Sequence, residues 1–96
     1  MENNNFQFNR IAIVGLGYVG LPLAMEFARH KDVIGYDYSQ KRIQNLIEGI
    51  DTTNEVSADS LINTGLHLTS ESSDLNFCDV YIITVPTPVT ADKNPD

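Results

Sequence analysis

Short apolar runs and helical spacing alternate along the chain. Apolar runs rich in β-branched residues occur at 11–14, 33–36 and 80–85. Such runs are typical of strands that are buried on both faces of a parallel sheet. We therefore expect a strand at each position, with 80–85 as a central strand. Apolar residues at steps of three and four predict a helix over 19–30. The residues expected to face the sheet are Leu16, Val19, Leu23 and Phe27.

A second helix is predicted after the second apolar run. Ser39 is a candidate N-cap for this helix, and Gly49 is a candidate stop. The apolar face of the helix would carry Ile43, Leu46 and Ile47.

Weaker elements are expected in the second half of the chain. The polar segment 50–60 predicts an irregular loop with one helical turn around 58–62. A short strand at 67–69 and a short helix within 71–77 would follow. Strands that alternate with helices at this interval indicate βαβ units. The predicted fold class is therefore α/β, a Rossmann-type parallel sheet with helices on both faces.

The most informative motif follows the first apolar run. Gly15, Gly17 and Gly20 form a G-x-G-x-x-G pattern between a predicted strand and a predicted helix. In dinucleotide-binding domains the first glycine permits a tight turn, the second lets the main chain approach a diphosphate, and the third allows close helix packing. The diphosphate would lie at a helix N-terminus, where free N–H groups and the helix dipole favour negative charge.

An acidic residue stands where this motif requires one. Asp37 ends the second apolar run, seventeen residues after Gly20. At this position a carboxylate can accept hydrogen bonds from the adenosine ribose hydroxyls, and it would repel a 2′-phosphate. The pattern therefore favours NAD over NADP, although Lys41 and Arg42 could pair with a phosphate. The alternative for Asp37 is a solvated turn residue.

Length and charge narrow the possible functions. Ninety-six residues make one small domain at most, so we expect only the N-terminal part of a dinucleotide-binding domain. Residues 1–9 are expected to be a mobile lead-in, and 10–96 a partial NAD-binding domain. The net charge is −7, and residues 49–96 hold eight acidic side chains with Lys93 as their only basic one. An acidic chain without a basic stripe argues against nucleic acid as a partner.

The sequence offers no sign of a metal site, of secretion or of a membrane span. Cys78 is the single cysteine, so it cannot form an internal disulfide, and no Cys/His cluster accompanies it. The N-terminus lacks a signal-peptide pattern, and no apolar run reaches the eighteen residues that a membrane span needs. We expect a cytoplasmic protein.

Two motifs together resemble a known family. The segment Gly-Leu-Gly-Tyr-Val-Gly-Leu-Pro at 15–22 and the segment Tyr-Ile-Ile-Thr-Val-Pro-Thr-Pro at 81–88 are similar to those of the UDP-glucose/GDP-mannose dehydrogenase family. The second segment and the stretch 49–55 most resemble the Vi-polysaccharide-type branch. That branch oxidises UDP-N-acetylglucosamine or UDP-N-acetylgalactosamine to the uronic acid in surface-polysaccharide synthesis.

The resemblance implies roles for particular residues. Tyr18 and Val19 would form walls beside the diphosphate, and Asp37 would contact the ribose. Arg42 matches the basic residue beside the adenosine end of NAD, and Thr87 matches a cofactor-contacting threonine. Thr87 lies between two prolines after the last predicted strand, at the sheet edge where ligands bind. The alternatives are a solvated Arg42 on the second helix and a Thr87 in a loop that is rigid for packing.

The family's chemistry requires residues that this chain does not hold. Members oxidise the sugar C6 alcohol to a carboxylate with two NAD, through a cysteine nucleophile that lies beyond residue 96. No catalytic residue is therefore expected here, and Cys78 is expected to be a small buried hydrophobe. The parent enzyme would act on a UDP-sugar as at least a homodimer.

Three alternatives to this reading stay open. The substrate of the parent could be UDP-glucose or UDP-ManNAc. The chain could be a non-catalytic dinucleotide-sensing module. It could also belong to another Rossmann dehydrogenase, such as a 3-hydroxyacyl or 6-phosphogluconate type, although these lack the two joined motifs.

Overall fold

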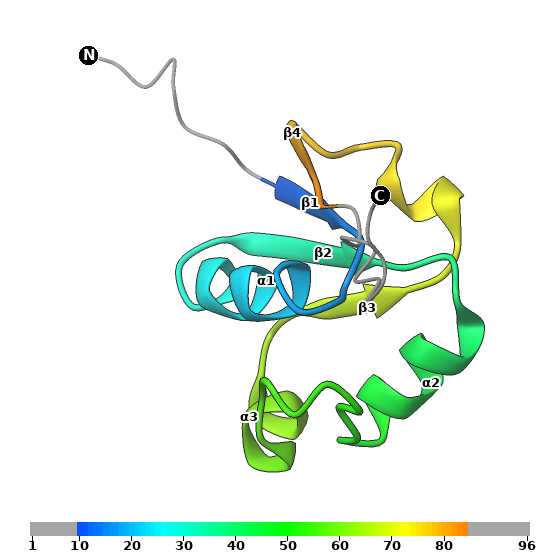
Figure 1. Ribbon diagram of the computed structural model, residues 1–96. Coiled ribbons are helices and arrows are strands. Elements are labelled where there is room, and N and C mark those ends of the chain that lie inside the picture. Colours follow the sequence, from blue (N-terminus) through cyan, green and yellow to red (C-terminus); the bar gives the residue numbers. More distant parts are fainter. Residues whose placement is uncertain (1–9, 85–96) are drawn as a thin grey trace, which may run out of the picture.

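A four-stranded parallel sheet forms the centre of the molecule (Figure 1). The computed structural model describes residues 10–84, so the expected lead-in at 1–9 and the segment 85–96 lie outside the described residues. The elements, in chain order, are β1 (Arg10–Val14), α1 (Gly20–Ala28), β2 (Asp32–Tyr36), α2 (Gln40–Ile47), α3 (Ala58–Asn63), β3 (His67–Thr69), the 3₁₀ helix η2 (Ser72–Leu75) and β4 (Val80–Ile83). Strands and helices alternate as the sequence predicted, which confirms the fold class.

The strand order is β3-β2-β1-β4, and every pair is parallel. Ile11 of β1 lies opposite Val33 of β2 on one side and Val80 of β4 on the other. The chain thus builds outward from β1 to β3 and then crosses back to β4. This reversal places the carboxyl ends of β1, β2 and β4 side by side, which is where open α/β sheets bind ligands.

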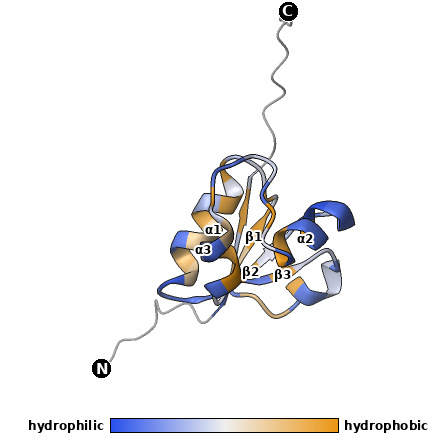
Figure 2. Cartoon of the chain, turned by 90° about the horizontal axis from the view of Figure 1, so that it is seen from below, coloured by the Kyte–Doolittle hydropathy of each residue, from blue (hydrophilic) through white to orange (hydrophobic). Residues whose placement is uncertain are grey.

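The main core lies on the face that the α-helices cover. Side chains alternate along a strand, so Ile11 and Ile13 of β1 share this face with Val33 of β2. They pack in one buried cluster with residues from α1, α2 and α3, namely Leu21, Ala24, Ile43, Leu46 and Leu61. Figure 2 shows the hydropathy of these elements: β1 is mostly hydrophobic, and α2 carries many hydrophilic residues beside its buried apolar ones.

The 3₁₀ helix lies on the opposite face of the sheet. Thr69 of β3 points to that face, and its hydroxyl donates to the Asp74 carboxylate of η2 over 2.5 Å. The segment expected as a short helix within 71–77 is therefore a single 3₁₀ turn. Helical elements thus lie on both faces, as predicted: the three α-helices cover one face, and within residues 10–84 only the 3₁₀ turn lies on the other.

The predicted orientation of α1 is confirmed for all of its sheet-facing residues but one, and the helix starts one residue later than predicted. Val19 precedes the helix instead of starting it, and its side chain is 65% exposed. Leu16 is fully buried, and Leu23 and Phe27 pack partly buried against the core, as predicted. The fully buried apolar side chains of α1 itself are Leu21 and Ala24, which were not among the predicted residues. The α-helix ends at Ala28, two residues before the predicted end.

The capping prediction for α2 is confirmed, and one of its packing residues is not. The Ser39 hydroxyl accepts a hydrogen bond from the Arg42 amide over 3.1 Å, and Gly49 adopts φ +84° just after the helix. Ile43 and Leu46 are buried, but Ile47 is 55% exposed because it lies in the last turn of a helix that has only eight residues.

The strand β4 differs most from its prediction. We expected a central strand, but within residues 10–84 β4 lies at the edge of the sheet. Its side chains alternate: Val80 and Ile82 pack against the main core, whereas Tyr81 and Ile83 are exposed. The apolar run gave the strand correctly, but the number of strands beside it is a property of the tertiary structure.

Candidate functional site

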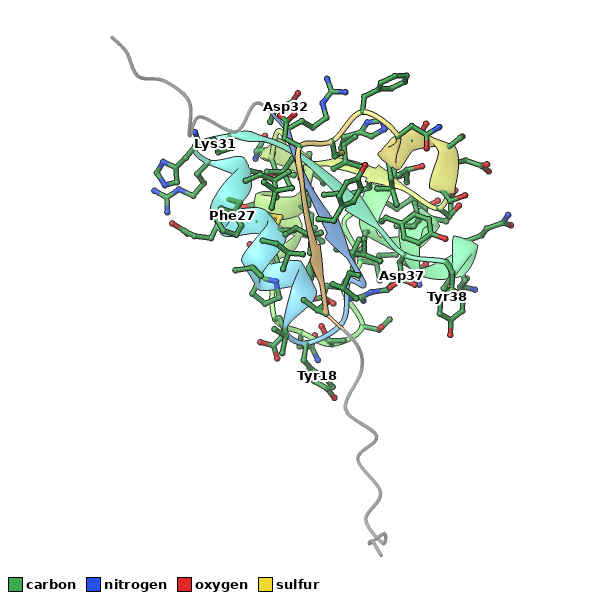
Figure 3. The ribbon with its side chains drawn as sticks, turned by 90° about the horizontal axis from the view of Figure 1, so that it is seen from above. Tyr18, Phe27, Lys31, Asp32, Asp37 and Tyr38 are labelled. Carbon is green, nitrogen blue, oxygen red and sulfur yellow. The ribbon has the colours of Figure 1, made fainter. Side chains whose placement is uncertain are left out.

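A cleft of about 540 Å³ opens at the carboxyl ends of β1, β2 and β4. Its wall is made by the turn after β1, the residues after β2, one residue of the 50–56 loop and the end of β4. Tyr18 and Asp37 lie at this end of the sheet, and Lys31 and Asp32 at the other (Figure 3). The cleft is lined by Val14, Gly15, Leu16, Gly17, Tyr18, Val19, Gly20, Tyr36, Asp37, Tyr38, Ser39, Arg42, Thr53, Ile83 and Thr84.

Two of the three glycines leave no room for a side chain. Gly15 has φ +102°, and a Cβ on it would lie 2.0 Å from the carbonyl oxygen of Thr84. A Cβ on Gly20 would lie 1.8 Å from the carbonyl oxygen of Gly15. The first glycine therefore makes the turn, and the third brings α1 directly onto that turn.

The middle glycine faces open space. Nothing lies within 4 Å of a Cβ placed on Gly17. Moreover, the amides of residues 17–20 donate to no acceptor within residues 10–84, while the Leu21 amide donates to the Gly17 carbonyl and begins the helix. Four amides without an acceptor among residues 10–84, at the N-terminus of α1, form a site that suits an anion such as a diphosphate.

Asp37 supports the same turn from the end of β2. Its Oδ2 accepts the Leu16 amide and its Oδ1 accepts the Ser39 amide, each over 3.0 Å. A carboxylate offers about four acceptor positions. Asp37 therefore holds the turn and keeps acceptor capacity for a ligand hydroxyl in the cleft.

Arg42 lines the cleft but directs most of its donors into the protein. Its Nε and Nη2 donate to the Leu16 carbonyl oxygen over 2.8 and 2.6 Å. Its Nη1 donates to Asp51 Oδ1 over 2.9 Å. The Arg42 side chain is only 12% exposed, so the alternative of a solvated residue is excluded.

Asp51 is a buried carboxylate that the sequence did not single out as a site residue. Its side chain is fully buried, and it accepts from the Thr53 amide and hydroxyl, the Glu55 and Val56 amides and Arg42. Burial by itself would raise the pKa of Asp51, but the bonds from Thr53, Val56 and Arg42 outweigh it and hold the pKa well below its usual range.

Thr84 is a second residue that sequence reasoning missed. Its hydroxyl donates to the Gly15 carbonyl over 2.7 Å and ties the end of β4 to the turn. The available signal was a polar residue at the end of an otherwise apolar strand. Thr87, which the resemblance implied as a cofactor contact, lies outside the described residues.

Tyr18 and Val19 both line the cleft and are each 65% exposed. Their position agrees with walls beside a diphosphate. Tyr38, which follows Asp37, lines the cleft as well and points outward (Figure 3).

Cys78 lies away from this cleft, just before β4. It is partly buried, and burial raises the pKa of its thiol, which disfavours the reactive thiolate. Within residues 10–84 no group of His, Cys, Asp and Glu side chains could hold a metal ion. None of the helices in the described part is long and apolar enough to cross a membrane.

The residues at the cleft fit a dinucleotide with a diphosphate and a free ribose diol. Free amides at 17–20 match the diphosphate, and the Asp37 carboxylate matches ribose hydroxyls. Among residues 10–84, the only cation that lines the cleft is Arg42, and its guanidinium is bonded to the Leu16 carbonyl and to Asp51.

Known proteins are similar to this chain in sequence and in fold. The chain is 50% identical over 88 residues to a UDP-N-acetyl-D-glucosamine 6-dehydrogenase of Pseudomonas aeruginosa, covering 91% of this chain and 21% of the relative. It is 48% identical over 88 residues to the enzyme of the same name from Salmonella typhi, with the same coverage of both chains. The chain thus spans about a fifth of the length of the curated relatives it matches.

Solved structures agree. The UDP-D-ManNAc dehydrogenase of Pyrococcus horikoshii superposes with a TM-score of 0.73 at 37% identity, over 86% of this chain and 21% of that one. The NAD binding domain of the UDP-glucose/GDP-mannose dehydrogenase family matches residues 9–96. The chain therefore belongs to the UDP-glucose/GDP-mannose dehydrogenase family, as its NAD binding domain.

Proposed function

We propose that this chain is the NAD-binding part of a nucleotide-sugar 6-dehydrogenase for surface-polysaccharide synthesis. The enzyme oxidises the C6 alcohol of a UDP-N-acetylhexosamine, UDP-GlcNAc or UDP-GalNAc, to the uronic acid with two NAD. The observation that carries the proposal is the free amides at 17–20 beside the Asp37 carboxylate. Support for the substrate comes from the relatives that are 50% and 48% identical, which are both UDP-N-acetyl-D-glucosamine 6-dehydrogenases.

The chain's own residues would bind and orient the cofactor. The free amides at 17–20 would hold the diphosphate, and Asp37 would accept from the adenosine ribose. Tyr18 and Val19 would border the diphosphate, Arg42 would border the adenosine end, and Thr87 would contact the cofactor from the segment after β4. NAD supplies the hydride acceptor.

The proposal has a direct test in the full-length protein. Purified enzyme is given NAD with UDP-glucose, UDP-GlcNAc, UDP-GalNAc and UDP-ManNAc in parallel, and NADH is followed by absorbance. We expect turnover of one N-acetylhexosamine, UDP-GlcNAc or UDP-GalNAc, at two NADH per sugar. Turnover of UDP-glucose or UDP-ManNAc instead would overturn the substrate assignment.

Two further measurements sharpen the test. Calorimetric titration should show binding of NAD and at least tenfold weaker binding of NADP, because Asp37 would repel the 2′-phosphate. Measurable NAD binding without turnover of any of the four sugars would favour a dinucleotide-sensing module. The 96-residue chain alone is expected to form no NADH with any UDP-sugar, since the nucleophile and the sugar-binding residues are assigned to other parts of the enzyme.

A further inference from the structure

We infer that Asp51 is a positioning residue for the NAD site: through Arg42 it fixes the Leu16 carbonyl and so sets the direction of the amides that receive the diphosphate. The inference rests on the proposed NAD site and assigns a function to the 50–56 loop. It concerns a residue that lines no part of the cleft.

The first step is the geometry of Leu16. Both polar groups of its backbone are held by side chains from after β2: the amide by Asp37 and the carbonyl by Arg42. The described residues contain no cis peptide bond. In a planar trans peptide the Leu16 carbonyl and the Gly17 N–H point in opposite directions. Whatever fixes the Leu16 carbonyl therefore also fixes the Gly17 N–H.

The second step is that the peptide between Leu16 and Gly17 needs a hydrogen bond from elsewhere in the fold to fix its direction. Gly17 has no Cβ and faces open space, so local packing does not restrict its peptide groups. The amides at 17–20 also lack acceptors within residues 10–84. Without the Arg42 fork on the Leu16 carbonyl, the first peptide of the anion site would be free to rotate.

The third step leads from Arg42 to Asp51. The guanidinium is planar and presents its donors in a rigid fork, so a bond at one nitrogen helps to fix the direction of the others. The Leu16 carbonyl holds Nε and Nη2, and Asp51 Oδ1 holds Nη1 at 2.9 Å. The Asp51 carboxylate is fully buried, so water cannot replace it as the partner of Arg42.

The fourth step explains why Asp51 itself is immobile. The 51–56 loop winds around its carboxylate: Oδ1 accepts the Thr53 amide and hydroxyl, and Oδ2 accepts the Glu55 and Val56 amides over 2.8 and 3.0 Å. The same loop brings Thr53 to the wall of the cleft. Loop, arginine and glycine turn thus form one connected hydrogen-bond network.

The variant Asp51→Asn separates this role from a direct contact. An asparagine presents N–H₂ either to the Glu55 and Val56 amides or to Arg42, so donors meet donors in both orientations. Arg42→Lys is the second variant, since it keeps the charge but loses the fork on the Leu16 carbonyl. Glu55→Gln is the matched control, because it removes one exposed negative charge from the same loop and leaves the network intact.

The experiment measures the Kd for NAD by calorimetry in the full-length protein, well below the melting temperature of each variant. We expect Asp51→Asn and Arg42→Lys each to raise the Kd at least tenfold, and Glu55→Gln to change it less than twofold. The double variant should bind no more weakly than the weaker single variant, because both changes break one network. Additive losses, or a normal Kd for Asp51→Asn with a raised Kd for Arg42→Lys, would overturn the inference in favour of a direct contact between Arg42 and NAD.

A cofactor-free measurement makes the result independent of NAD binding. Hydrogen exchange of a peptide over 14–23 reports the hydrogen-bonded amides of Leu16, Leu21 and Leu23. We expect at least threefold faster exchange there in Asp51→Asn and in Arg42→Lys, and no change in β2. If the wild-type protein fails to bind NAD but the variants show this local change in exchange, the proposed function alone would be overturned. Unchanged or uniformly faster exchange in the variants would sink the positioning role.

Discussion

The two sides of the cleft are built from different interactions. On the side of β2 and α2, side-chain hydrogen bonds from Asp37 and Arg42 hold the backbone of Leu16. On the side of β4, Thr84 is bound to β1 and the turn by its amide on the Val14 carbonyl and its hydroxyl on the Gly15 carbonyl, and the neighbouring Ile83 is 68% exposed. On the polar side, the described residues satisfy the hydrogen bonds that hold the turn. On the apolar side, exposed hydrophobic surface remains, and its burial would stabilise the protein.

The two sides of the cleft therefore meet different requirements: one fixes the direction of the amides, and the other stabilises the strand. The direction of a few amides depends on polar contacts made close by in space. The stability of the strand at the cleft depends on how much apolar surface its neighbours cover. A mutation on one side should therefore affect binding, and a mutation on the other should affect association or stability.

The largest loss of stability is expected at Gly20, where α1 packs directly on the glycine turn. Gly20→Ala would place a Cβ 1.8 Å from the Gly15 carbonyl oxygen. Because the obstacle is backbone, we expect a loss of about 3 kcal/mol or more in the free energy of unfolding, measured by urea denaturation. Gly17→Ala is the comparison: its Cβ meets nothing within 4 Å. It should keep the wild-type stability and weaken NAD binding. Equal stability losses for both variants would contradict the different roles of the two glycines.

The polar side should also show itself in the pH dependence of stability. The pKa of Asp51 is lowered in the folded protein: burial opposes this shift, but hydrogen bonds from Thr53, Val56 and Arg42 prevail. A lowered folded pKa stabilises the protein above the unfolded pKa of about 3.9 and loses that contribution as pH falls toward the folded value. Between pH 7 and pH 3, wild type should lose on the order of 1 kcal/mol more than Asp51→Asn. Parallel pH curves for the two proteins would contradict this assignment.

A smaller effect is expected from the cap of α2, which helps to present Arg42. Ser39→Ala removes the acceptor of the Arg42 amide. We expect a loss of about 1 kcal/mol in the free energy of unfolding, measured by thermal or urea denaturation. Ser73→Ala, at an exposed position in η2, should have no measurable effect. An identical loss for both serines would show that the cap contributes nothing specific.

The smallest effect on stability is expected on the apolar side. The 96-residue chain should self-associate or fold weakly, because Tyr81 and Ile83 of β4 are exposed at the edge of the described sheet. Ile83→Lys should reduce association in sedimentation and change the free energy of unfolding by less than about 0.5 kcal/mol. Ile47→Lys, on α2, is the matched control and should leave association unchanged. A concentration-independent monomeric melt of the wild-type chain would contradict the expectation.

Sequence reasoning succeeded where one short segment decides the structure. The glycine spacing predicted the turn, and Gly15 and Gly20 prove to be sterically required. The Ser39 cap was readable because its partner lies only three residues away. It was less accurate where the exact start of a helix or the neighbours of a strand decide the outcome. Val19 precedes α1 and is exposed, and β4 lies at the edge of the described sheet.

The sequence by itself determined the parallel α/β fold, the glycine turn, the acidic residue after β2 and the family, because these depend on residue type at fixed local spacing. Only the tertiary structure decided the partners of Arg42 and Asp51. They are nine residues apart in sequence, and Arg42 reaches Leu16 across a separation of twenty-six. Hydrogen bonds over such separations depend on how β1, α2 and the 50–56 loop pack together. No local pattern of residues encodes that packing.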